Sequence, residues 1–176
     1  ILFAIDEVYF PFGNFTFKNL VKRFKNVVVM RSFSKAFGLA GARIGYLISS
    51  KTNIRFFKNT KGGYETNILS AKALEFVLEN IKYSENYIKD VLSGSSFIKK
   101  KLNDLKLKYY GGINGNFIFI EFKTSKIANE IHKKLIKNKV VTRYGFSKLF
   151  EKGILVTIGP LREMRIFLRI LKSVIV

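Results

Sequence analysis

Short apolar runs separated by polar loops mark the first third of the chain. Residues 1–5, 27–33 and 42–50 form apolar runs of strand length, a pattern that favours buried β-strands. The short link between the second and third runs predicts a hairpin-like return rather than a helical crossover. Short helices are predicted over 19–26 and 52–60.

The pattern becomes helical after residue 67. Apolar residues at helical spacing predict a helical region over 68–107, and the run Ser93-Gly94-Ser95-Ser96 predicts a break or bend within it. The remainder alternates between the two periods, with strands expected over 116–122, 139–144 and 153–160 and helices over 125–139 and 161–176. We therefore expect a segment with buried strands, a helical connection and a compact βαββα unit.

The first apolar run begins at Ile1, without a polar lead-in. Because a buried parallel strand needs a neighbour on each side, we expect a further N-terminal part of the protein to precede it. No apolar run is long enough to span a membrane, and we expect no secretion signal before the first strand. A cytoplasmic location is the default expectation.

Composition restricts the kinds of site and partner. The chain has no cysteine and one histidine, His132, so we expect no disulfide and no metal site. A net charge of +20 would suit nucleic acid or anionic lipid. However, lysine outnumbers arginine by 24 to 8, the basic residues are dispersed, and nucleic-acid recognition relies on arginine. We therefore expect a solvated lysine-rich surface, with no nucleic-acid partner and no membrane partner.

Two strand ends carry residues with chemical potential. Asp6 ends the first apolar run, where open α/β sheets bind ligands, and Tyr9 follows three positions later. Lys35 follows the second run, where partial burial and cationic neighbours would make its amine a nucleophile able to form a Schiff base. The hydroxyls of Ser32 and Ser34 are suited to hold a phosphate. Taken singly, Asp6 and Lys35 are each better explained as ordinary solvated loop residues.

Arg43 lies at the start of the third apolar run, among small residues. We expect its guanidinium to be partly buried and paired with an anion, either a bound phosphate or a structural carboxylate. Together with Asp6, Lys35 and the two serines, it matches what pyridoxal 5'-phosphate (PLP) needs. These needs are an amine for covalent attachment, an acid that keeps the ring nitrogen protonated, and cations and hydroxyls for the phosphate.

The segments DEVYFPF (6–12) and RSFSKAFGLAGARIGY (31–46) resemble the active-site region of class I/II, fold-type I aminotransferases, most closely the histidinol-phosphate aminotransferase group. The later stretches NGNFIFIEF, VVTRYG and ILVTIGPLREM resemble the small-domain strands of that group. The resemblance implies an α/β fold: part of the large-domain sheet (1–67), an interdomain helical region (68–107) and a small C-terminal α/β domain (108–176).

The resemblance also implies a role for each matching residue. Asp6 would pair with the pyridine nitrogen, Tyr9 would donate to the ring hydroxyl, and Lys35 would hold the cofactor covalently and shuttle a proton. The phosphate would be held by a set of three residues: Ser32, Ser34 and Arg43. A homodimer with active sites at its interface is implied as well.

Two departures from the family pattern affect this expectation. The family's phosphate-binding turn, ring-stacking aromatic and ring-hydroxyl Asn lie upstream of such a segment and are absent here. Leu155 stands where the family has an arginine for the substrate's anionic group. Arg143 and Arg162 are the nearest cations in sequence, and Arg143, which matches another family arginine, is the expected substrate-binding residue.

The implied reaction transfers an amino group between an amino-acid donor, such as glutamate, and a small keto or aldehyde acceptor with or without a phosphate. A PLP-dependent decarboxylase of a phospho-amino acid would use the same residues. An inactive remnant and a basic nucleic-acid-binding module are further alternatives. Only the last predicts salt-sensitive nucleic-acid binding that survives Lys35→Ala.

Overall fold

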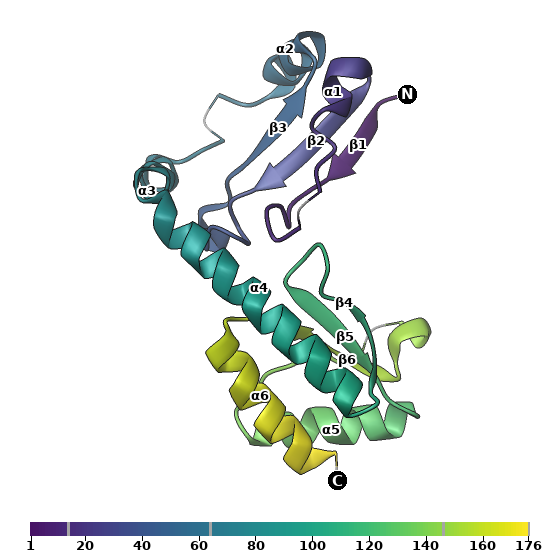
Figure 1. Ribbon diagram of the computed structural model, residues 1–176. Helices are drawn as coiled ribbons and strands as arrows, with labels where there is room; N and C mark the ends of the chain where they lie inside the picture. The colour runs from purple at the N-terminus through teal and green to yellow at the C-terminus, as the bar shows by residue number, and fades with distance from the viewer. Residues whose placement is uncertain (14, 64, 146, 176) are drawn as a thin grey trace. The chain divides into compact units, whose positions relative to one another are not determined.

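The computed structural model describes residues 1–13, 15–63, 65–145 and 147–175 (Figure 1). The chain separates into two compact units, Ile1–Ile88 and Lys89–Val176, and each is described by itself. The expected division into 1–67, 68–107 and 108–176 stays a prediction.

The first unit is organised around a three-stranded sheet of order β1-β2-β3. Strand β1 (Phe3–Asp6) runs parallel to β2 (Val27–Ser32), and helix α1 (Leu20–Arg23) lies between them in sequence. Strand β3 (Gly45–Ser49) returns antiparallel to β2, which confirms the predicted hairpin-like connection. The central strand β2 is the buried one, because it has a neighbour on each side.

Strand β1 differs from the expected buried strand. It pairs with β2 along one edge, and most of its residues are exposed, with Phe3 at 62% of its full accessibility. The apolar composition of residues 1–5 predicted the strand, and the second neighbour expected for it is not among the described residues. Among the described residues, the first unit has its apolar core around Val27, Val28, Val29 and Phe12.

Three helices follow the sheet: α2 (Lys51–Thr60), α3 (Ile68–Glu79) and α4 (Ile81–Asp104). The predicted break at Ser93–Ser96 is wrong, because α4 continues through it and the helical region is interrupted at Asn80 instead. Gly94 is needed for close packing: a Cβ there would collide with the carbonyl oxygen of Gly159. The small residue thus allows a neighbouring segment to approach the helix.

The second unit contains an antiparallel sheet of order β4-β5-β6, made of β4 (Lys108–Gly111), β5 (Phe117–Glu121) and β6 (Gly153–Thr157). Two further helices belong to it, α5 (Ser125–Lys137) and α6 (Leu161–Val174). Strand β4 was not expected. The expected strand over 139–144 is wrong, since that stretch makes one isolated bridge, between Arg143 and Leu155.

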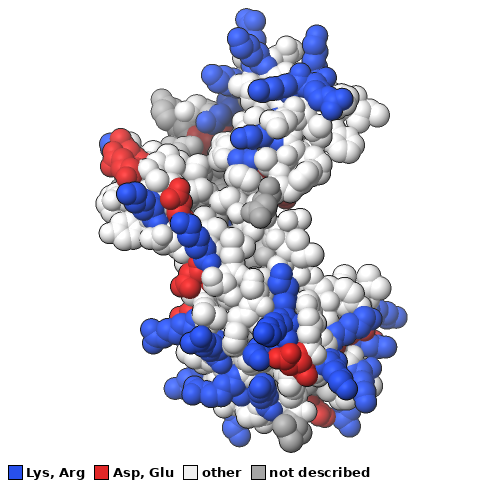
Figure 2. All heavy atoms as spheres, viewed as in Figure 1, with Lys and Arg blue, Asp and Glu red and all other residues white. Residues whose placement is uncertain are grey.

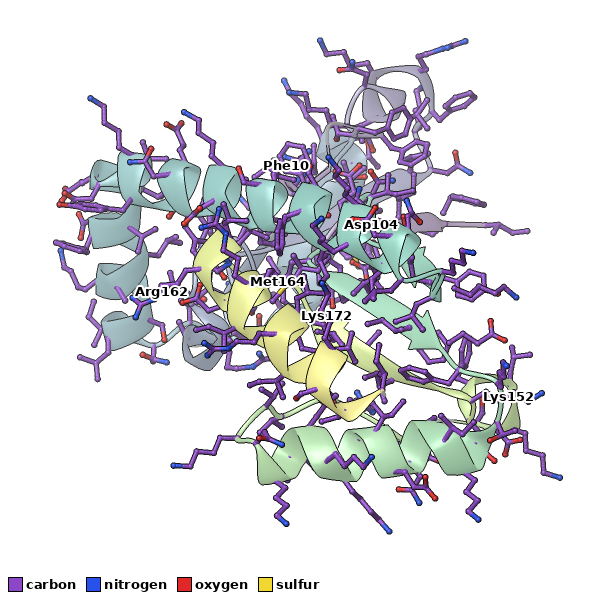
Figure 3. The ribbon with its side chains drawn as sticks, turned by 60° about the horizontal axis from the view of Figure 1, so that its bottom comes forward. Phe10, Asp104, Lys152, Arg162, Met164 and Lys172 are labelled. Carbon is purple, nitrogen blue, oxygen red and sulfur yellow. The ribbon has the colours of Figure 1, made fainter. Side chains whose placement is uncertain are left out.

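The core of the second unit follows the two predicted periodicities. Alternate residues of β5 and β6 are buried, and so is one face of each helix, as expected for a sheet and helices that share one apolar layer. The fully buried side chains of this unit include Ile98, Leu102, Ile118, Ile120, Leu135, Ile154, Ile158 and Leu171. Figure 3 shows Met164 and Lys172 on α6, of which Met164 is buried and Lys172 is exposed.

Lys and Arg side chains are spread over the visible face of both units, with Asp and Glu among them (Figure 2). Such dispersal fits the expectation of a solvated lysine-rich surface. Within the described residues, no helix combines the length and the apolar character that a membrane crossing requires.

Candidate active site

Asp6 and Ser32 are the last residues of the parallel strands β1 and β2. Their carboxyl ends therefore lie at the same edge of the sheet, the position where open α/β sheets bind ligands. Asp6 lies opposite Met30 in the ladder, two residues before Ser32. Because side chains alternate along a strand, Asp6 and Ser32 belong to the same face of the sheet.

Lys35 lies in the turn that leaves β2. The turn is closed by backbone hydrogen bonds from Leu39 to Phe33 (3.0 Å) and from Gly38 to Lys35 (3.3 Å), and Gly38 has a φ of +72° that favours glycine. The Lys35 side chain is exposed, and its Nζ lies 5.6 Å from the centre of the Tyr9 ring. The fold thus brings together two expected site residues from different strand ends.

Asp6 and Ser32, also at this edge, have local hydrogen-bond partners. One carboxylate oxygen of Asp6 accepts from the backbone N–H of Val8 at 2.9 Å. The Ser32 hydroxyl accepts from the backbone N–H of Ser34 at 3.0 Å and donates to the carbonyl of Ile44 at 3.5 Å. Asp6 is exposed and both serines are half-buried, so all three side chains are close to solvent.

Arg43 corrects one sequence expectation. It is exposed and lies before β3, not in a strand, because the short helix η1 (Ala40–Ala42) ends at it in the left-handed conformation, with φ 53°. Its Nη1 donates to the carbonyl of Ala40 at 3.1 Å. The predicted partial burial of its guanidinium is therefore wrong.

The buried arginine of this unit is Arg31, which the sequence reasoning passed over. Arg31 lies inside the apolar run that forms β2, and its partner is Glu7, next to Asp6. A charge within a buried strand signals a buried pair, because an isolated charge there would be unstable. That signal was available in the run VVVMRS together with the acid at position 7.

Arg143 belongs to the second unit, where it forms a bridge with Leu155. The two residues exchange backbone hydrogen bonds of 3.0 and 2.8 Å. The flanking residues are tied to α5, since Thr142 lies 2.8 Å from Nδ1 of His132 and the ring of Tyr144 stacks on the same imidazole. Arg162, in the first turn of α6, is exposed (Figure 3).

Comparison with known proteins identifies the family. The model of aminotransferase class I and II matches residues 1–171 of this chain. Histidinol-phosphate aminotransferase 1 of Carboxydothermus hydrogenoformans is 32% identical over 174 residues, which are 99% of this chain and 49% of that protein. The chain belongs to the class I and II aminotransferase family, and it spans about half the length of the curated relatives it matches.

Solved structures share the fold. The histidinol-phosphate aminotransferase of Sinorhizobium meliloti, in complex with pyridoxal-5'-phosphate, superimposes with a TM-score of 0.83 at 23% identity, over 99% of this chain and 48% of that one. The L-threonine-O-3-phosphate decarboxylase of Porphyromonas gingivalis gives 0.80 at 22% identity, over 97% and 54%. The expected α/β fold of the fold-type I PLP-dependent transferases is thereby confirmed.

Proposed function

We propose that this member of the class I and II aminotransferases forms part of a PLP-dependent aminotransferase in which Lys35 binds the cofactor covalently. One observation carries the proposal. The parallel strands β1 and β2 end together, and the turn after β2 places the Lys35 amine 5.6 Å from the Tyr9 ring, in the loop after β1. An acid, a phenol, an amine and hydroxyls therefore converge at one sheet edge.

The donors present at this edge fit PLP. Lys35 supplies the amine, and Asp6 supplies a carboxylate that can hold a ring nitrogen protonated. Tyr9 carries a phenol hydroxyl that can form a hydrogen bond with the cofactor's ring hydroxyl. Hydroxyls and a guanidinium for the phosphate come from Ser32, Ser34 and Arg43. When bound, PLP supplies an electron sink for the bonds at the substrate's α-carbon.

Each side chain then has a defined task in the reaction. Asp6 is oriented by the backbone N–H of Val8, so its charge can be directed at the ring nitrogen without a search over rotamers. Lys35 has a flexible side chain. Its Nζ would accept the proton that leaves the substrate carbon and later return it. Ser32 and Ser34 would hold the phosphate group, and this anchor would limit the movement of the bound cofactor.

Substrate recognition is assigned to Arg143. Its guanidinium is proposed to bind the anionic group of a small keto or aldehyde acceptor, in place of the arginine that Leu155 replaces. The names of the relatives favour a phosphorylated substrate and a place in amino-acid biosynthesis. A homodimer and a cytoplasmic location stay predictions of the sequence.

A phospho-amino-acid decarboxylase is the second candidate, favoured by the structural likeness to the Porphyromonas gingivalis decarboxylase. Both reactions use the same residues of this chain. They differ in the product: amino transfer from glutamate yields a keto acid, whereas decarboxylation releases carbon dioxide.

The test uses the natural translation product that contains these residues, loaded with PLP and reduced with borohydride. Peptide mass mapping is expected to find the cofactor on Lys35. The Lys35→Ala variant should lose both this adduct and amino transfer, whereas Lys58→Ala, at an exposed lysine of α2, should keep them. A cofactor attached to another lysine, or none attached in the wild type, would refute the proposal and favour an inactive remnant.

A further inference from the structure

Glu7 and Arg31 form an ion pair inside the first unit. Nη2 of Arg31 lies 3.0 Å from Oε2 of Glu7, and both side chains are only 8% exposed. Each residue is adjacent in sequence to a proposed cofactor-binding residue, since Glu7 follows Asp6 and Arg31 precedes Ser32. Neither Glu7 nor Arg31 is among the residues proposed above to bind the cofactor.

The pair lies on the opposite face of the sheet from Asp6 and Ser32. Alternation of side chains along β1 and β2 separates Glu7 from Asp6 and Arg31 from Ser32. The contacts agree with this assignment, because Arg31 pairs with Tyr46 in the register of β2 with β3 and its Nη1 lies 3.3 Å from the Tyr46 hydroxyl. The backbone N–H of Glu7 donates to the carbonyl of Met30 at 2.8 Å, which keeps Glu7 in line with the sheet.

Both charged groups have several hydrogen-bond partners. Glu7 accepts from Nε of Arg31 at 3.0 Å, from the Thr16 hydroxyl at 2.9 and 3.1 Å, and from the backbone N–H of Phe17 at 2.6 Å. Arg31 also donates from Nη2 to the Thr16 hydroxyl at 2.7 Å. Burial lowers the pKa of Arg31, but its hydrogen bonds to Tyr46 and Glu7 outweigh this and raise it. The guanidinium therefore stays charged.

These contacts close the loop that carries Tyr9. Glu7 stands at the start of the loop, and Thr16 and Phe17 stand near its end, so a single carboxylate joins the two. Between them, the ring of Phe10 lies against the Arg31 guanidinium, with Cζ 3.6 Å from the ring centre. Tyr9 is the residue before Phe10, and its ring faces the Lys35 amine.

We propose that the Glu7–Arg31 pair is a positioning device that holds Tyr9 and Asp6 in place for the cofactor from the far face of the sheet. The proposal rests on the function proposed above. It predicts that weakening the pair loosens the loop and the cofactor together. If the pair only stabilised the unit, weakening it would lower global stability and leave cofactor binding unchanged.

The decisive variant is Arg31→Lys, which keeps the positive charge but removes the planar fork that reaches Glu7, Thr16 and Tyr46. Thr16→Val is the milder second variant, which leaves the ion pair and removes the bridging hydroxyl. The matched control is Glu75→Gln, which breaks the exposed Lys72–Glu75 pair (2.6 Å) in the same unit.

Two measurements are made on each variant. Hydrogen exchange without PLP follows the amides of Val8 and Phe10, whose N–H groups donate to Asp6 and Glu7, with the amides of α2 as an internal reference. Absorbance of the cofactor is the second measurement. Titration with PLP gives the Kd, and titration of the loaded protein with acid and base gives the pH midpoint of the absorbance. For Arg31→Lys we expect about tenfold faster exchange of the loop amides and about tenfold weaker PLP binding, as for the loss of one charged hydrogen bond.

The results separate the two proposals. Loop exchange that speeds up relative to α2, with a shifted absorbance midpoint, supports the positioning role, and Glu75→Gln should change neither. Unchanged loop exchange in Thr16→Val and Arg31→Lys, or an unchanged Kd and midpoint despite faster exchange, overturns it. If the wild type binds no PLP on Lys35, the proposed function fails, and the positioning role fails with it whatever the exchange shows.

Discussion

Arg143 and Leu155 lie directly opposite each other in an antiparallel bridge, joined by backbone hydrogen bonds of 3.0 and 2.8 Å. Directly opposed residues of such a pair project to the same side. The cation of Arg143 is therefore next to position 155, where the family resemblance implies an arginine. The replacement at position 155 need not leave the substrate's anion without a partner.

This relationship predicts that the two positions can exchange roles. Arg143→Leu should lower kcat/KM for a phosphorylated substrate about 10- to 100-fold, because a charge-assisted hydrogen bond is lost. Adding Leu155→Arg to this variant should restore much of the lost kcat/KM. Both effects should appear mainly in KM. Steady-state kinetics with phosphorylated and unphosphorylated substrates check this. No effect of Arg143→Leu on either substrate would remove Arg143 from the site.

Asp6→Asn separates cofactor binding from catalysis. The amide keeps an oxygen for the Val8 N–H, so the loop should stay folded, but it lacks the charge that we propose keeps the ring nitrogen protonated. We expect kcat to fall about 100-fold or more, a typical loss for one preorganised electrostatic contact. Borohydride trapping on Lys35 should persist. Full activity of Asp6→Asn would contradict the assigned role.

Gly94→Ala should destabilise the second unit. A Cβ at Gly94 would collide with the Gly159 carbonyl oxygen and lie 3.1 Å from Cγ of Met164, on α6. Overpacking of this kind costs about 1–3 kcal/mol, which should exceed the gain of about 1 kcal/mol from the better helix propensity of alanine. Ser93→Ala, at an exposed neighbouring position of α4, is the control. A higher melting temperature for Gly94→Ala would show that the contact can relax.

Glu121 should make stability depend on acid pH. A hydrogen bond from the Tyr110 hydroxyl (2.9 Å) and the ion pair with Lys108 (3.1 Å) hold the pKa of Glu121 below its usual 4.5. A lowered pKa in the folded state gives stabilisation that is present above about pH 4.5 and lost as the pH falls through the folded value. Thermal unfolding should therefore place Glu121→Gln below the wild type at about pH 7, with a smaller difference at about pH 3.

The control for this pH effect is Glu130→Gln, at an exposed carboxylate of α5 in the same unit. It should show no comparable pH-dependent difference from the wild type. If Glu121→Gln and the wild type differ equally at both pH values, the effect comes from packing and not from the charge of Glu121.

Local patterns were sufficient for much of the fold. The apolar runs predicted strands β2, β5 and β6, and the short link after β2 predicted the antiparallel return, because strand period and loop length are properties of a few neighbouring residues. The placement of Asp6 and Ser32 at strand ends followed from the same runs. The family resemblance, carried by contiguous residues around Lys35, was equally readable from the sequence.

Contacts between distant residues decided the rest. The valines before Arg143 suggested a strand, yet that stretch forms one isolated bridge. It follows Lys139, which lies just after the end of α5 and has a φ of 62°. A small, polar run around Gly94 suggested a break, but the glycine serves an approach by Gly159, far along the chain.

The arginines give the same lesson for the candidate site. The sequence by itself placed Lys35 and Asp6 at strand ends, because alternation and spacing are local. Only the tertiary structure showed that Arg43 is exposed while Arg31 is buried against Glu7 and Phe10. Burial of a charge depends on which distant groups surround it, and those partners, 24 residues apart in the case of Glu7 and Arg31, are brought together only by folding.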